Sequence, residues 1–124
     1  MVAKYQKTKL KEDYVKERYQ ELLDYMESNK SFTDNNLTLD KLAGQLDISE
    51  NKLSQVINTQ SKDNFFEFVN KYRVEMVIRK MEEGEHKTST LLGLAFDSGF
   101  NSKASFNRAF KRITGVTPTD YLKT

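Results

Sequence analysis

The stretch from residue 94 to residue 113 constrains the fold more than any other part of the chain, because one glycine interrupts an otherwise helical pattern. Gly99 tolerates the positive φ angle with which a helix ends and the chain turns sharply. Ser102 stands where its hydroxyl caps a following helix. One side of that helix is apolar at helical spacing (Phe106, Ala109, Phe110, Ile113), and the other is largely polar (Lys103, Asn107, Arg108, Lys111). The pattern predicts a helix-turn-helix with an exposed second helix, the geometry that enters a DNA major groove.

A second copy of this motif, less clearly marked, is predicted earlier in the chain. Thr38 and Ser49 are suited to cap two successive helices. Asp47 occupies the turn position at which a glycine is expected, and aspartate adopts the left-handed conformation at some energetic cost. On the second of these helices we expect Leu53, Val56 and Ile57 to be buried, and Asn51, Lys52, Ser54 and Gln55 to face outward.

We expect an all-α fold with two helix-turn-helix subdomains joined by a long linker helix and preceded by an N-terminal amphipathic helix. One proline and five glycines leave long stretches uninterrupted, and no stretch alternates as a strand does. Residues 1–36 are predicted to hold the N-terminal helix (11–29) and a polar linker, and residues 37–124 the domain with both motifs. Within that domain we place the first helix-turn-helix at 37–60, the linker helix at 64–83 and the second helix-turn-helix at 90–113.

Composition excludes several classes of function. The chain has no cysteine, so disulfides, thiolate metal sites and cysteine nucleophiles are ruled out. His86 is the single histidine and stands in a polar loop without companion ligands, so we expect no metal and no cofactor. There is no phosphate-binding glycine loop and no convergent carboxylate pair, so we expect no enzyme. No apolar run approaches the roughly 18–20 residues that span a membrane, and we expect a cytoplasmic chain without membrane contact of its own.

Charge is unevenly distributed along the sequence. The net charge is only +2, but five basic residues and one acid occur from residue 99 onward, a local charge of +4. Residues 31–60 hold two basic residues and four acids, a local charge of −2. An electrostatic footprint on DNA is therefore expected at the C-terminal motif.

Over roughly residues 37–122 the sequence resembles the DNA-binding domain of the AraC/XylS family of bacterial transcription regulators. The most specific part is the run Ala95-x-x-x-Gly99-Phe100-x-Ser102-x-x-x-Phe106-x-Arg108-x-Phe110-Lys111-x-x-x-Gly115-x-Thr117-Pro118-x-x-Tyr121. The chain departs from the family pattern at Asp47, at Ser61 and Lys62, and at Leu122. The resemblance implies two recognition helices that contact successive major-groove segments of double-stranded DNA, about 34 Å apart, on one face of the duplex.

The resemblance also indicates which side chains contact DNA. Base contacts are expected from Asn51, Lys52, Ser54 and Gln55 in the first motif, and from Lys103, Ala104, Ser105, Asn107 and Arg108 in the second. Lysine and arginine donate to guanine, amides pair with adenine, and alanine contacts the thymine methyl group. Phosphate contacts, which position a protein without specifying sequence, are expected from Ser49, Lys62, Ser102, Lys111 and Arg112.

Several questions stay open at the level of sequence. The apolar stripe of the N-terminal helix (Val15, Tyr19, Leu22, Met26) either packs on the domain or mediates self-association. Residues 5–14 resemble the juncture that precedes this domain in longer sensor proteins, including membrane-anchored regulators, which would make the chain an excised output domain. The acidic cluster Glu82, Glu83 and Glu85 is either a solvated helix end or a surface for RNA polymerase. Arg73, in the linker helix, is expected to pair with a helix-end carbonyl or an acid rather than with DNA.

An alternative function is a protein-interaction module on the same helix-turn-helix scaffold, without specific DNA binding. The modest net charge and the acidic first motif favour it. Neutralising Lys103 and Arg108 would leave partner binding intact in such a module.

Overall fold

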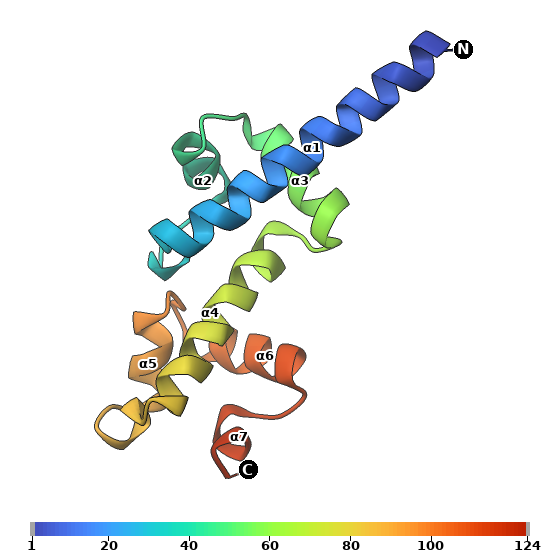
Figure 1. The fold of residues 1–124 in the computed structure, drawn as a ribbon. Coiled ribbons are helices and arrows are strands. Elements are labelled where there is room, and N and C mark those ends of the chain that lie inside the picture. Colours follow the sequence, from blue (N-terminus) through green and yellow to red (C-terminus); the bar gives the residue numbers. More distant parts are fainter. Residues whose placement is uncertain (1, 124) are drawn as a thin grey trace. The chain divides into compact units, whose positions relative to one another are not determined.

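Every regular element of the described chain is helical. The computed structural model describes residues 2–123, with side chains from residue 11 onward. The elements are α1 (Val2–Asn29), the 3₁₀ turn η1 (Ser31–Thr33), α2 (Leu39–Gln45), α3 (Glu50–Ser61), α4 (Phe65–Glu82), the 3₁₀ turn η2 (Glu85–Lys87), α5 (Leu91–Asp97), α6 (Lys103–Thr114) and α7 (Pro118–Lys123) (Figure 1). The predicted all-α fold is confirmed.

The first helix is longer than predicted. Expected over residues 11–29, α1 extends N-terminally to Val2, because no glycine or proline occurs before Gly44 to interrupt it. It ends at Asn29, and the next residue, Lys30, adopts a left-handed φ of 56°. The juncture expected at residues 5–14 falls mostly on side chains that lie outside the described ones.

The described residues form two compact units. Unit 1 contains the chain up to Lys30 together with Thr38–Phe65, and unit 2 contains Ser31–Leu37 together with the chain from Phe66 onward. Each unit therefore holds one helix-turn-helix: α2 and α3 in unit 1, α5 and α6 in unit 2. The N-terminal helix belongs to the same unit as the first motif. The polar linker predicted before residue 37 belongs to the same unit as the second motif.

In unit 1, the N-terminal helix is part of the core. α1 and α2 both pack on α3, and α1 crosses in front of α3 in Figure 1. Leu22 and Met26 of α1 are fully buried, and Tyr25 Oη donates a hydrogen bond to Gln45 Oε1 over 2.8 Å. Val15 and Tyr19 are half-buried. The apolar stripe therefore packs on its own unit over its C-terminal half.

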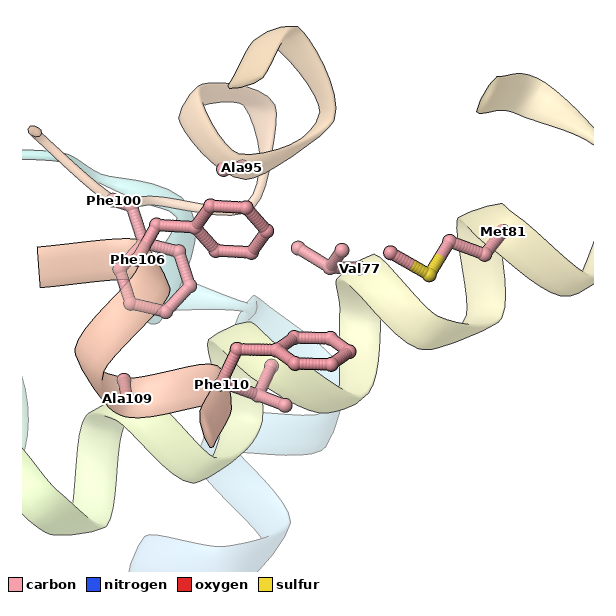
Figure 2. Close-up of a cluster of buried hydrophobic side chains, with 8 residues drawn as sticks. Val77, Met81, Ala95, Phe100, Phe106, Ala109 and Phe110 are labelled. Atoms are coloured by element: carbon pink, nitrogen blue, oxygen red, sulfur yellow. The ribbon is translucent and has the colours of Figure 1, made fainter. Parts of the chain in front are cut away.

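The core of unit 2 gathers side chains from α4, α5 and α6. Val77 and Met81 of α4 lie with Phe106 and Phe110 of α6 in one buried cluster, which Figure 2 shows. The rings of Phe106 and Phe110 meet edge to face, with centroids 5.8 Å apart. Aromatic pairs of this geometry stabilise a core beyond the area they bury. This packing fixes which side of α6 faces inward.

The segment predicted as a polar linker is anchored rather than free. Phe32 is buried, and its ring stacks on Tyr72 with centroids 5.5 Å apart. Arg73, only 9% exposed, donates from Nε to the Phe32 carbonyl (2.7 Å) and from Nη2 to the Asp34 carbonyl (3.0 Å). As expected, Arg73 thus bonds backbone carbonyls. Burial lowers the pKa of Arg73, and the charge of Asp34 offsets part of that shift.

Candidate nucleic-acid interface

The two helix-turn-helix motifs share one backbone pattern at the turn. The amide of Ile48 donates to the carbonyl of Ala43, and the amide of Phe100 donates to the carbonyl of Ala95, at 3.1 and 3.0 Å. Both alanines are buried, which lets the turn close on the first helix. The residue before each donor amide has a positive φ, as predicted, with 56° at Asp47 and 111° at Gly99. The two motifs that the sequence predicted as repeats therefore have the same hydrogen-bond pattern at their turns.

Serine hydroxyls begin both exposed helices, as predicted. Ser49 Oγ accepts from the Lys52 amide, and Ser102 Oγ accepts from the Ser105 amide, each over 3.1 Å. α3 and α6 each have 12 residues from their caps onward. Counted from the cap, Lys52 and Ser105 are both third in their helices, and Gln55 and Arg108 are both sixth. This register lets the two helices be compared residue by residue.

α6 turns a buried apolar face into unit 2 and a polar face away from it. Phe106, Ala109 and Phe110 are buried, as predicted. The exposed residues of α6 that the sequence assigned to DNA are Lys103, Ala104, Asn107, Arg108, Lys111 and Arg112. Within the part of the chain that the structure describes, no ion pair or hydrogen bond engages the charged ends of Lys103, Arg108 and Lys111. Three cations on this face therefore remain available to an anionic partner.

Two predicted contacts of the second motif are held partly against their own unit. Ser102 and Ser105 are half-buried, and the Ser102 hydroxyl donates to Ser105 Oγ over 2.9 Å. Ser105 also lines a polar pocket of about 180 Å³ with Asn70 and Arg73. Nearby in unit 2, Asn35 Nδ2 donates to the carbonyls of Phe96 (3.1 Å) and Phe100 (2.7 Å).

Arg112 is exposed but already paired. Its Nη1 donates to Glu67 Oε2 of α4 over 2.8 Å. The two side chains are 41% and 38% exposed, so this is a solvent-accessible ion pair of modest strength. A phosphate would share the guanidinium with Glu67, whereas Lys111 has no such competitor among the described residues.

α3 exposes the side chains that the sequence assigned to its outer face. Leu53, Val56 and Ile57 are buried, while Asn51, Lys52 and Gln55 are exposed and Ser54 is half-buried. Ser49 is exposed at the start of the helix. Lys62 is exposed at its end and has a left-handed φ of 65°.

One edge of this α3 surface borders α1. Lys52 Nζ lies 4.9 Å from the ring centroid of Tyr14, and Arg18 Cζ lies 5.0 Å from the same centroid. About one turn further along α3, Gln55 lines an open groove of about 300 Å³ with Lys11 and Val15 of α1. α1 therefore flanks the side of α3 that carries Lys52 and Gln55.

Sequence reasoning did not identify three of these contacts. The ring of Tyr14 against Lys52, the carboxylate of Glu67 on Arg112 and the amide of Asn35 on the turn before α6 all join residues far apart in sequence. Spacing along one helix carries no signal for such pairs.

Within the described residues, no three histidine or acidic side chains gather as a metal site. His86 lies half-buried in η2. Among the same residues, no helix has the length and apolar character needed to cross a lipid bilayer.

Comparison with known proteins identifies the fold's family. A family model described as a helix-turn-helix domain matches residues 42–124. An AraC-like transcription regulator of Streptomyces lividans is 29% identical over 86 residues, which are 69% of this chain and 27% of that protein. The chain therefore spans about a quarter of that curated relative's length.

Solved structures agree with this match. The C-terminal domain of AraT, a response regulator from Geobacillus stearothermophilus, is 26% identical with a TM-score of 0.68, over 88% of this chain and 83% of that one. A Listeria innocua protein of unknown function is 30% identical with a TM-score of 0.69, over 85% of this chain and 94% of that one. Together with the paired motifs described above, these matches show that the chain belongs to the AraC-type helix-turn-helix family of DNA-binding transcription regulators.

Proposed function

We propose that this chain binds specific double-stranded DNA by placing α6 and α3 in two successive major-groove segments, and that it thereby regulates bacterial transcription. The observation that carries the proposal is the exposed face of α6, where Lys103, Arg108 and Lys111 have no partner within the described residues. Lysine and arginine at such positions donate to guanine and to phosphate. The family of the chain supports the same function.

The roles of individual residues follow from their exposure. We assign base contacts on α6 to Lys103, Ala104, Asn107 and Arg108, and on α3 to Asn51, Lys52 and Gln55, all of which are exposed. Ser54 and Ser105, both half-buried, take a lesser share. Phosphate contacts are assigned to Lys111, Lys62 and Arg112 and to the capped starts of both helices at Ser49 and Ser102.

The proposal includes no catalytic step. The relatives from Streptomyces are named as transcription regulators, and neither name describes an enzyme. We place the chain in the cytoplasm, where its DNA target lies. Self-association through Val15 and Tyr19, and a contact of the acidic end of α4 with RNA polymerase, are compatible with this role.

The test is selection of binding sites from a random pool of double-stranded DNA with the purified chain, followed by sequencing. The proposal predicts an enriched site with two short elements about one helical turn apart. A single enriched element would remove α3 from base recognition. Absence of any enrichment would contradict the proposal.

A matched variant separates this function from the protein-interaction alternative. Lys103→Ala combined with Arg108→Ala removes two exposed charges from α6 and leaves its buried face unchanged. If the chain is a DNA-binding domain, this variant loses enrichment. If it is an interaction module, binding to its protein partner survives.

A further inference from the structure

We infer that Tyr14 of α1 is a positioning residue for Lys52, so that the N-terminal helix helps to determine how the first recognition helix contacts DNA. The inference rests on the proposed function and adds to it a residue outside both helix-turn-helix motifs. Its basis is the contact between the Tyr14 ring and the Lys52 ammonium in unit 1.

The geometry is that of a cation–π interaction. Lys52 Nζ lies 4.9 Å from the ring centroid, inside the limit of about 6 Å at which such contacts attract. Lys52 is otherwise exposed, and an exposed lysine on a four-carbon stem samples many rotamers. A ring held at one place therefore narrows the directions in which this ammonium points.

The ring itself is held in place by the packing of α1. Further along the same helix, Leu22 and Met26 are fully buried in unit 1. Tyr25 is bonded to Gln45 of α2. Because a helix is stiff over a few turns, these anchors fix the position of Tyr14 relative to α3. Tyr14 is therefore part of the framework of unit 1, although it lies upstream of the first motif.

The equivalent position of the second motif supports the inference. Lys52 and Ser105 are both third in their recognition helices. Ser105 is held by the Ser102 hydroxyl and lines a pocket with Asn70 and Arg73. In both units, then, the side chain at the third position contacts residues of its own unit, but only in α3 is it charged and exposed.

An aromatic partner leaves the lysine able to bind DNA. The ammonium carries three N–H donors, and a ring face attracts it without neutralising its charge as a carboxylate would. The second cation at this ring, Arg18, is paired with Glu21 across α1. Among the described residues, Lys52 is thus the cation of this cluster that has no acid bound to it. The contact orients Lys52 and keeps it available.

Three variants test the inference on the selected site. Tyr14→Leu removes the ring but keeps an apolar side chain, Tyr14→Phe keeps the ring, and Lys52→Met removes the ammonium. We expect Tyr14→Leu to weaken binding about two- to fivefold, the range given by an exposed cation–π contact. Tyr14→Phe should bind as the wild type does. On a site whose α3 element is scrambled, the wild type and Tyr14→Leu should bind alike.

The decisive comparison is the double variant. If Tyr14 acts through Lys52, Tyr14→Leu causes no further loss of affinity in a Lys52→Met background. An independent loss in that background would overturn the inference, as would tighter binding by Tyr14→Leu, which would mean that the ring withholds Lys52 from DNA. Wild-type-like binding by both Tyr14→Leu and Lys52→Met would also overturn it, while leaving the proposed function intact. Failure of the wild-type chain to enrich any site would instead contradict the proposed function.

A measurement on the free chain guards against misfolding of the variants. The ring current of Tyr14 should shift the Nζ-adjacent methylene protons of Lys52 upfield in the wild type and in Tyr14→Phe. Loss of that shift in Tyr14→Leu, with the other α3 resonances unchanged, is expected. Absence of the shift in the wild type would overturn the inference without any DNA experiment.

Discussion

The two turns differ at their left-handed residue, and close packing accounts for the difference. At Gly99, an added Cβ would collide with the carbonyl oxygen of Phe32 and would lie 2.6 Å from Nε of Arg73. The carbonyl belongs to the backbone and cannot rotate away. Asp47 adopts φ 56° with its side chain exposed. The first turn therefore tolerates aspartate, whereas the second admits only glycine.

We predict that Gly99→Ala destabilises the chain much more than Gly115→Ala. Both glycines have positive φ, but a Cβ at Gly115 would meet nothing within 4 Å. Gly115→Ala should cost only the left-handed penalty of about 1–2 kcal/mol. Gly99→Ala adds an overpacking term, for a total of about 2–5 kcal/mol. Urea unfolding followed by circular dichroism measures both, and equal losses would contradict the close approach of Phe32.

A second residue-scale prediction separates base contacts from phosphate contacts on α6. Arg108→Ala should cost about 1–3 kcal/mol on the selected site and relax the sequence preference at one base pair. Lys111→Ala should weaken binding to all sequences alike and lower the salt slope by about 1. Titrations on selected and random duplexes distinguish the two. If Arg108→Ala weakens both duplexes equally, Arg108 contacts phosphate.

At this scale, the sequence predicted the features that depend on neighbouring residues, such as helix caps and positive φ angles. It did not predict contacts between residues far apart in the chain. The caps at Ser49 and Ser102 and the positive φ at Gly99 follow from residues within four positions, so local chemistry suffices. Arg73 bonds the carbonyl of Phe32, 41 residues away, and no periodicity encodes that pair. The same holds for Tyr14 and Lys52.

At the scale of elements, the placement of α1 could not be predicted from the sequence. The sequence left open whether its apolar stripe packs or self-associates, and the structure buries Leu22 and Met26 within unit 1. The first motif alone has two helices, α2 and α3, with one shared apolar face between them. A third helix, α1, packs on another side of α3 and leaves its outer face exposed. An apolar stripe on a helix predicts that the helix packs against another surface, but not whether that surface belongs to the same chain.

We predict that Leu22→Ala destabilises unit 1 selectively. Removing a fully buried leucine leaves a cavity and typically costs about 2–5 kcal/mol. Hydrogen exchange should then accelerate at the amides of α2 and α3 by more than at those of α5 and α6. Val15→Ala, on the same stripe but half-buried, is the matched control and should cost about 1 kcal/mol or less. Equal effects of the two substitutions would show that α1 is not a core element.

Across the whole molecule, two similar motifs carry different charge. The outer face of α6 presents Lys103, Arg108 and Lys111, whereas that of α3 presents Lys52 among amides. Phosphate contacts supply most of the salt-dependent affinity of DNA-binding proteins. On this basis we expect α6 to supply affinity as well as specificity, and α3 to supply chiefly specificity.

The final prediction follows from this asymmetry and compares two double variants. Lys111→Ala with Arg112→Ala removes the two charged phosphate contacts assigned to α6, so the dependence of log K on log salt should become shallower by about 1.8, near 0.9 per phosphate. Asn51→Ala with Gln55→Ala removes exposed amides but no charge, and should leave the salt slope unchanged while erasing preference within one element. Titrations at several salt concentrations measure the slopes, and repeated site selection measures the preferences. If both double variants change the salt slope equally, the charge on α6 contributes no more to binding than the amides on α3. The difference in charge between the two helices would then not govern binding.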